Sequence, residues 1–237
     1  MEENVSVLKS VCKKLPVTLV KFSSDYVLAG IGGDLCLFDS SESFTVKNHI
    51  NVLSNITIHG VSLTKERSSI CVFGGHQIAL LDTDFKSSLA WLKPVHKWKV
   101  RDWILCCEWV EDPTNTKLVS LSAHNQLSLW DPRSGKNLAT VACTEQCILY
   151  CATLVRCGRR WFDTVVVAGT VFQQIIVWAV LPFPDSPSDK PVPVIHKLSG
   201  HKGVIFSVVY NEQLRLITST SDDRSTRVWS VDSTSCG

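Results

Sequence analysis

The sequence carries little charge of either sign. Only 19% of its 237 residues are charged, and 24 basic side chains stand against 22 acidic ones. A net charge of +2 gives no large positive field, so any nucleic-acid contact must come from local clusters. Hydrophobic residues make up 45%, which is typical of a globular protein with a sizeable core and excludes disorder for most of the chain. The length fits one large all-β domain or two small domains.

The amino terminus lacks an apolar run of signal-peptide length. It opens with two glutamates, so we expect a reducing, cytoplasmic setting for the ten cysteines rather than a disulfide framework. Cys106 and Cys107 lie in an apolar, strand-like run. Cys143, Cys147 and Cys151 lack the two-residue spacing of a zinc knuckle. Buried thiols that act as small hydrophobic side chains are therefore predicted.

Signatures of cofactor and metal sites are also missing. No glycine-rich loop follows a strand and opens a helix, so a cradle for a methyl-donor cofactor is absent and catalysis by this chain is not expected. No bound metal is expected either, because the following histidines are dispersed without ligand spacing: His49, His59, His76, His96, His124 and His196.

One stretch, residues 165–183, is apolar enough to suggest a membrane span. Thr170, Gln173 and Gln174 lie at its centre, where unpaired polar groups would be costly in lipid. We therefore expect two buried strands and a turn, and no membrane partner.

The sequence does contain an internal repeat. Each unit has a short apolar strand, a tight turn of small residues and a second apolar strand, at residues 26–39, 70–82, 118–131, 165–180 and 216–232. Alignment on the second strand places Phe38, Leu81, Trp130, Trp178 and Trp229 in register, at separations of 43, 49, 48 and 51 residues. This period predicts an all-β propeller of about five four-stranded blades over residues 1–237.

Further strand-like runs supply other strands of each blade, at residues 15–22, 56–63, 103–110, 148–155 and 204–210. Gly32-Gly33, Gly74-Gly75 and Asn125 supply the positive φ that tight turns need. Residues 182–193 hold five of the nine prolines and predict a surface loop, followed by an outer strand at 194–198. Residues 1–14 are predicted to be an amino-terminal extension.

The last repeat strongly resembles a WD repeat, because it contains Gly200-His201, Ser219, Asp223 and Trp229. The resemblance implies that His201, Ser219, Asp223 and Trp229 form a hydrogen-bonded structural tetrad, which would satisfy the polar atoms of a buried indole and imidazole. An alternative takes His201, Ser219 and Asp223 as a hydrolase triad. The lack of a GxSxG elbow weighs against it.

A wider resemblance rests on the order of the segments HGVSLT, VFGGHQIALL, RDWILCCEWVED, LSLWDPRSGK, ATVACTEQCIL, TVVVAGTVFQQIIVW and SGHKGVIFSVVY. This order is similar to the amino-terminal region of the WD repeat-containing protein six family. The resemblance implies a non-catalytic adaptor that positions tRNA for an FtsJ-type methyltransferase, which makes the 2′-O-methyl mark at the wobble nucleotide. The alternative is a generic WD-repeat scaffold that joins proteins and has no RNA role.

The family that the chain resembles has a much longer chain with further WD repeats. We therefore expect an incomplete, open ring in which the fifth blade lacks its outer strand. Such a ring would expose apolar blade faces beside the first and fifth repeats.

Two basic clusters are candidate tRNA contacts. One has Lys97, Lys99 and Arg101, with Lys93, around Trp98, and the other has Arg156, Arg159 and Arg160 beside Trp161. Either cluster could contact phosphates. Ordinary solvated loops are the alternative, which is favoured because clusters of three or four charges are common on protein surfaces. The two tryptophans are interpreted as propeller core.

Overall fold

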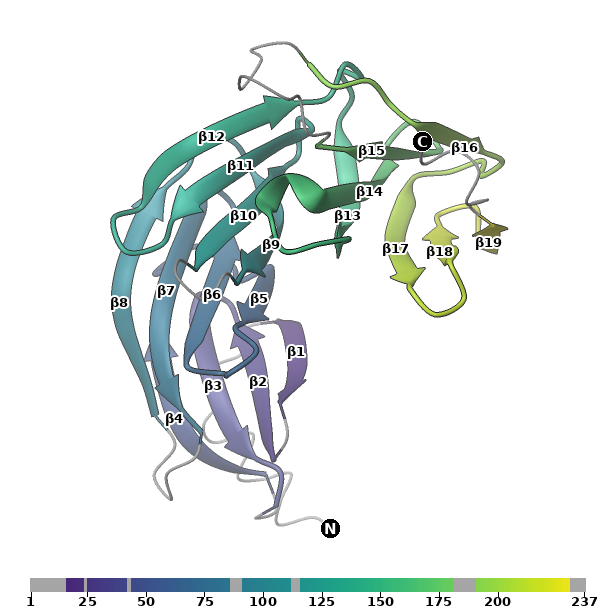
Figure 1. The fold of residues 1–237 in the computed structure, drawn as a ribbon. Helices are drawn as coiled ribbons and strands as arrows, with labels where there is room; N and C mark the ends of the chain where they lie inside the picture. The colour runs from purple at the N-terminus through teal and green to yellow at the C-terminus, as the bar shows by residue number, and fades with distance from the viewer. Residues whose placement is uncertain are drawn as a thin grey trace. The chain divides into compact units, whose positions relative to one another are not determined.

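The computed structural model describes residues 16–23, 25–41, 44–85, 91–111, 116–180 and 191–230. Within these ranges the strands form five antiparallel sheets, and the single helical element is a 3-10 turn, η1 (Trp161–Asp163). In every sheet the strands lie side by side in chain order, from one edge to the other (Figure 1). The all-β class and the repeated blade plan predicted from the sequence are confirmed, as expected for a WD-repeat propeller.

The chain divides into two compact units, of which the first runs to Arg101 and includes Arg133–Gly135. Its first sheet contains β1 (Val17–Ser23), β2 (Tyr26–Ile31), β3 (Asp34–Asp39) and β4 (Thr45–Asn51). Its second sheet contains β5 (Gly60–Leu63), β6 (Ser69–Gly74), β7 (Gln77–Asp84) and β8 (Trp91–Lys99). The core of the unit lies between the two sheets, where Leu28 and Leu37 pack in one cluster with Ile70.

The second unit holds the other three sheets. The third sheet contains β9 (Ile104–Val110), β10 (Lys117–Ser122), β11 (Gln126–Asp131) and β12 (Lys136–Ala142). The fourth contains β13 (Leu149–Arg156), β14 (Thr164–Thr170), β15 (Gln174–Ala179) and β16 (His196–Ser199). The fifth contains β17 (Ile205–Asn211), β18 (Leu216–Ser221) and β19 (Thr226–Ser230). Residues 231–237 lie outside the described residues, so the prediction that the fifth blade lacks its outer strand stays a prediction.

The predicted hairpins owe their turns to residues that tolerate positive φ. Gly32, Gly75 and Asn125 have φ values of 59°, 51° and 62°. Gly33 is required for a different reason, because a Cβ there would lie 2.1 Å from the Ser54 carbonyl oxygen. The turn chemistry predicted from the sequence therefore agrees with the structure.

The apolar stretch at 165–183 forms the hairpin β14–β15, which confirms the prediction of two buried strands and a turn. In the described part of the chain, no helix has the length and apolarity needed to cross a membrane.

The outer strands differ most from the sequence prediction. β4, β8 and β12 were not identified among the strand-like runs. Lys93, Lys97 and Lys99 therefore lie on β8 and not in a loop, because backbone pairing with β7 holds this polar segment extended. The outer strand expected at 194–198 is β16, which begins two residues later.

The carboxyl-terminal end of the proline-rich segment differs from the surface loop that the sequence predicts, because Val192 is buried. Residues 181–190 and the predicted extension at 1–14 lie outside the described residues. Val192, however, is 3% exposed and forms a parallel bridge with Cys143. Its carbonyl accepts a hydrogen bond from the Thr144 N–H at 2.8 Å, and its N–H donates to the Ala142 carbonyl at 2.8 Å. An apolar side chain between prolines is thus buried in the core of the second unit.

Most described cysteines are buried free thiols, as the sequence predicts: Cys36, Cys71, Cys107, Cys143 and Cys147. Burial raises the pKa of Cys147 to about 11 and that of Cys151 to about 11, so neither is a ready thiolate. Cys157 differs from the prediction because it is exposed. No group of three or more metal-ligating side chains occurs in the part of the chain that the structure describes.

Candidate functional site

The structure brings His201, Ser219, Asp223 and Trp229 together in the fifth sheet. The imidazole Nδ1 of His201 lies 2.9 Å from Asp223 Oδ2, and its Nε2 lies 2.8 Å from Ser219 Oγ. The indole Nε1 of Trp229 donates to the same Ser219 oxygen at 2.9 Å. An ionised carboxylate can only accept, so the proton of a neutral His201 ring is assigned to Nδ1, which donates to Asp223, and Nε2 accepts from the Ser219 hydroxyl. Ser219 in turn accepts from the Trp229 indole, which can only donate.

Asp223 anchors one end of this chain of hydrogen bonds. Its Oδ1 accepts from the Ser225 hydroxyl at 2.6 Å, and its Oδ2 accepts from the Lys202 N–H at 2.8 Å. The Ser225 and Lys202 hydrogen bonds, against the opposing effect of burial, hold the pKa of Asp223 far below its usual range. The carboxylate therefore stays ionised and fixes the imidazole.

The geometry of Ser219 weighs against the hydrolase alternative. Its side chain is 1% exposed, and its oxygen is engaged by both the indole and the imidazole. A serine nucleophile must reach a substrate carbonyl and face an oxyanion hole. This network holds the blade together and leaves the hydroxyl no access to a substrate.

The third sheet carries a variant of the same network that the sequence analysis missed. Ser120 accepts a hydrogen bond from Trp130 Nε1 at 2.8 Å, as Ser219 does from Trp229. Asp102 occupies the position of His201, and His124 occupies that of Asp223, at identical spacings from the serine and the tryptophan. The acid and the base have exchanged places, and His124 Nδ1 lies 2.9 Å from Asp102 Oδ1.

The exchange places this pair nearer to solvent. The His124 side chain is 66% exposed, whereas that of His201 is fully buried. Burial acts to raise the pKa of Asp102, but hydrogen bonds, the strongest from His124, outweigh it and hold this pKa below its usual value. The spacing of ten residues between serine and tryptophan, applied to the third repeat, was a signal that could have revealed the pair.

Trp178 in the fourth sheet is satisfied by a neighbouring sheet. Its Nε1 donates to Asn125 Oδ1 at 2.9 Å, and Asn125 Nδ2 donates to the Glu145 carbonyl at 3.1 Å. Asn125 is the turn residue with positive φ between β10 and β11. One side chain thus shapes a turn in the third sheet and satisfies an indole in the fourth.

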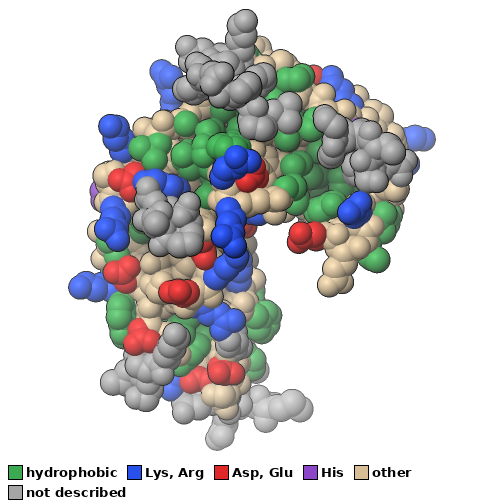
Figure 2. All heavy atoms as spheres, in the orientation of Figure 1, with side chains coloured by type: hydrophobic (Ala, Val, Ile, Leu, Met, Phe, Trp, Pro, Cys, Tyr) green, Lys and Arg blue, Asp and Glu red, His purple; other side chains and the backbone are tan. Residues whose placement is uncertain are grey.

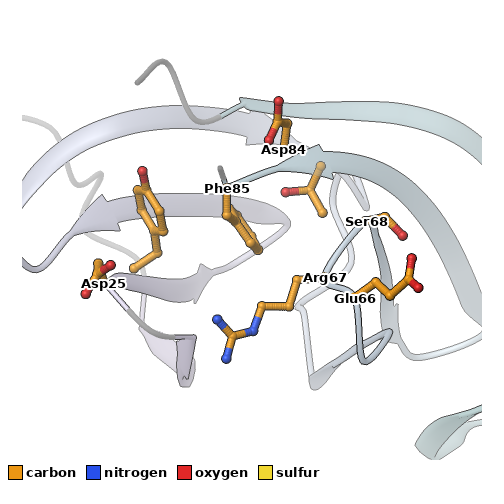
Figure 3. A pocket seen from close by; sticks show the side chains of 8 residues that line it. Asp25, Glu66, Arg67, Ser68, Asp84 and Phe85 are labelled. Carbon is orange, nitrogen blue, oxygen red and sulfur yellow. The ribbon is translucent and has the colours of Figure 1, made fainter. Parts of the chain in front are cut away.

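A pocket of about 330 Å³ lies in the first unit, beside the stacked rings of Tyr26 and Phe85. Asp25, Glu66 and Asp84 line it together with Arg67. Figure 3 shows the three carboxylates spread around Arg67 instead of converging on one point. The pocket thus offers no paired carboxylates for acid–base chemistry.

The two basic clusters differ in how their side chains are used. On β8, the exposed Lys97 donates to the Val52 carbonyl at 3.3 Å and to Ser54 Oγ at 3.4 Å, both uncharged acceptors. Lys93, Lys99 and Arg101 are also exposed, and among the described residues they form no hydrogen bond or ion pair. Trp98 stacks on His96 with ring centroids 5.5 Å apart. Both rings lie on the face of the strand that Lys93 shares, opposite Lys97 and Lys99.

The second cluster is largely occupied by its own loop. Arg156 donates to Thr164 Oγ1 at 2.5 Å and to the Arg160 carbonyl at 3.0 Å, and burial lowers its pKa. Arg160 pairs with Asp163 at 3.2 Å and lies 4.3 Å from the centre of the Phe162 ring. Arg159 alone has no described partner. Two of the three arginines are thus engaged within the loop.

An exposed apolar surface lies on the second unit. Tyr150 and Phe206 contact each other across β13 and β17, with ring centroids 5.4 Å apart, and both are exposed. On the fifth sheet, Val209, Thr218 and Val228 form one row in register, and the two valines are exposed. In the first sheet, Phe22 is exposed in the same way. Exposed apolar side chains are not confined to the first and fifth sheets, since Val95 on β8 and Leu138 on β12 are exposed as well.

Comparison with known proteins identifies relatives of this chain by sequence. No family model matches the chain. The tRNA (34-2'-O)-methyltransferase regulator WDR6 of Rattus norvegicus is 34% identical to it over 228 residues, which is 92% of this chain. The protein of the same name from Homo sapiens is 32% identical over 228 residues, also 92% of this chain. The one from Drosophila melanogaster is 24% identical over 225 residues, 90% of this chain. The chain is related to the WDR6 family.

This relationship confirms the resemblance predicted from the sequence. The match lies in an amino-terminal part of a larger protein, and the chain spans only 20% of the length of the rat and human relatives. Those relatives are named as regulators of a methyltransferase and not as methyltransferases.

Proposed function

We propose that this chain belongs to a non-catalytic adaptor that positions tRNA for an FtsJ-type methyltransferase, which adds a 2′-O-methyl group at the wobble nucleotide. The observation that carries the proposal is the match over 92% of the chain to proteins named as regulators of such a reaction. A role without catalysis is supported by the fifth sheet, where His201, Ser219 and Asp223 are engaged in the network that holds the blade together.

The experiment is reconstitution with the methyltransferase. The 237-residue chain and an FtsJ-type enzyme are expressed together, and 2′-O-methylation at tRNA position 34 is measured for the enzyme alone, the chain alone and the pair. We expect no methyl transfer by the chain alone and faster transfer by the pair. Transfer by the chain alone, or an enzyme that neither binds the chain nor responds to it, would contradict the proposal.

A second function, a protein–protein scaffold with no RNA role, is favoured by the exposed Tyr150–Phe206 contact. Exposed aromatic side chains are enriched where partners bind. The two functions differ in their response to salt. Retention of tRNA by the assembly falls steeply with salt if phosphates are contacted, whereas an apolar protein contact is much less sensitive. An assembly that retains no tRNA at low salt would favour the scaffold.

A further inference from the structure

The outer strand β8 presents a line of positive charge. Lys93, Lys97 and Lys99 lie on it and are exposed, and Arg101 follows the strand in the same compact unit. The register of β8 on β7 shifts between Leu80 and Leu81, which places Lys97 and Lys99 on one face of the strand and Lys93 on the face of His96 and Trp98. At about 3.3 Å per residue, the cations extend along the strand over roughly 26 Å. We name Lys93, Lys97, Lys99 and Arg101 the β8 row. Figure 2 shows separate Lys and Arg side chains, with Asp and Glu between them, on the side of the molecule where β8 lies in Figure 1.

The cations of the β8 row form no ion pair within the described chain, although Asp82 of β7 is the cross-strand neighbour of Lys93. No carboxylate of the described residues pairs with any of its four cations, and Lys97 bonds only to a carbonyl and a hydroxyl. Exposed cations normally lie among anions on a protein of balanced charge such as this one. An unpaired row is available to an external anion.

The strand that carries the row is held rigidly. β8 pairs with β7 along its whole length, from Asp84–Trp91 to Gln77–Lys99. On the face opposite Lys97 and Lys99, which Lys93 shares, the His96–Trp98 stack is covered by the turn at Gly135, where a Cβ would lie 2.7 Å from His96 Nε2. A fixed strand keeps the spacing of the cations, so less ordering is needed when a ligand binds.

We propose that the β8 row is the surface on which this chain contacts the phosphate backbone of RNA, and that the Arg156–Arg160 loop is not. This inference rests on the proposed function for the presence of tRNA, and the structure chooses between the two clusters. A linear polyanion suits a line of cations, because each phosphate that is neutralised releases counterions. The Arg156–Arg160 loop instead uses Arg156 and Arg160 to hold its own backbone and Asp163.

Lysines on an edge strand also have a structural explanation, since they prevent edge-to-edge pairing with other molecules. This explanation predicts that loss of the charges causes aggregation. Contact with RNA predicts a monomer of unchanged stability that binds RNA less tightly. The two can therefore be separated by sizing and binding measurements on one variant.

The experiment compares two variants of the 237-residue chain that lose the same charge. The first replaces Lys93, Lys97, Lys99 and Arg101 by Gln. The matched control replaces four exposed cations of the second unit by Gln: Arg159, Lys202, Arg215 and Arg224. Binding of a fluorescent tRNA is measured by anisotropy between 50 and 200 mM salt, and binding of the methyltransferase is measured separately in a pull-down.

We expect the row variant to bind tRNA at least tenfold more weakly at 50 mM salt. The slope of log affinity against log salt should flatten by about three, since four contacts contribute about 0.7 to 0.9 each. The control should retain the slope of the native chain, and both variants should still bind the methyltransferase. A row variant with all four positions as Arg should bind as the native chain does.

Four results would overturn the inference. If both variants lowered tRNA affinity equally, the affinity would depend on net charge only, and the proposed adaptor function would remain. Aggregation of the row variant without loss of tRNA affinity would assign the row to edge protection. Binding to vesicles of anionic phospholipid but not to tRNA would assign it to a membrane surface. A native chain that binds no tRNA, alone or with the methyltransferase, would remove the proposed function and this inference together.

Discussion

The substitution Ser219→Ala tests whether the buried network holds the fifth sheet. It removes one oxygen, so no large cavity forms, but it deprives two groups of their partner: the Trp229 indole N–H and His201 Nε2. An unsatisfied buried polar group costs about 1–3 kcal/mol. Trp229 is only half-buried and can regain some hydration, whereas His201 cannot. We expect the free energy of opening the fifth sheet to fall by about 2–4 kcal/mol.

The measurement must report on the fifth sheet, because a chain with two compact units need not unfold in one step. Hydrogen exchange of the amides in β17, β18 and β19 gives the local opening free energy. Thr220→Ala, at the exposed neighbouring position, is the control and should change this free energy by less than about 0.5 kcal/mol. Ser120→Ala in the third sheet should cost about 1–2 kcal/mol, since there only Trp130 loses its partner. The reasoning fails if Ser219→Ala costs less than Ser120→Ala.

Three further predictions follow from the same contacts. The double exchange Asp102→His with His124→Asp should restore the acid and base order of the fifth sheet. Each single change should destabilise the third sheet, and the double variant should recover at least the native stability in thermal unfolding. Asp223→Asn should flatten the fall in stability below pH 4. The depressed pKa of this aspartate gives stability that is present above its unfolded value of about 3.9 and is lost as pH falls toward the folded value. An acid titration with the same slope in both proteins would refute this. Arg156→Met should speed proteolysis after Arg160 and leave tRNA affinity unchanged, because this arginine holds the loop carbonyls. A loss of affinity would reassign the cluster.

The hairpins could be predicted because their signals are local. Apolar runs flank turns whose residues tolerate positive φ, as at Gly75 and Asn125. The network of the fifth sheet could be predicted for a similar reason, since its residue types occur at fixed separations within one repeat. In both cases the information lies within about thirty residues.

The outer strands could not be predicted because their side chains do not specify them. β4, β8 and β12 are exposed or half-buried, apart from Leu92, and carry many polar side chains instead of an apolar run. Hydrogen bonds between backbone groups hold each of them to a central strand of its sheet. Whether the β8 cations form ion pairs also depends on which carboxylates lie near them in the folded chain. The spacing of residues along the sequence does not show this.

The contact between Trp178 and Asn125 shows why the repeats look unequal in sequence. The residue ten positions before Trp178 is Ala168, which cannot accept a hydrogen bond, so the indole finds its acceptor 53 residues away. The third and fifth sheets supply Ser120 and Ser219 at that position. The fixed requirement is therefore an acceptor for the indole N–H and not a particular residue in the repeat.

The first two sheets meet this requirement by removing the donor. Phe38 and Leu81 replace the tryptophan, and neither has a polar atom to satisfy. The positions ten residues earlier are Leu28 and Cys71, both fully buried and neither a strong acceptor. These two sheets thus lack both the indole donor and the serine acceptor. A serine at Leu28 or Cys71 would have no indole to pair with, and its buried hydroxyl would be left unsatisfied. A tryptophan introduced at Phe38 would need a serine at Leu28 as well, and the single change should cost more stability than the pair.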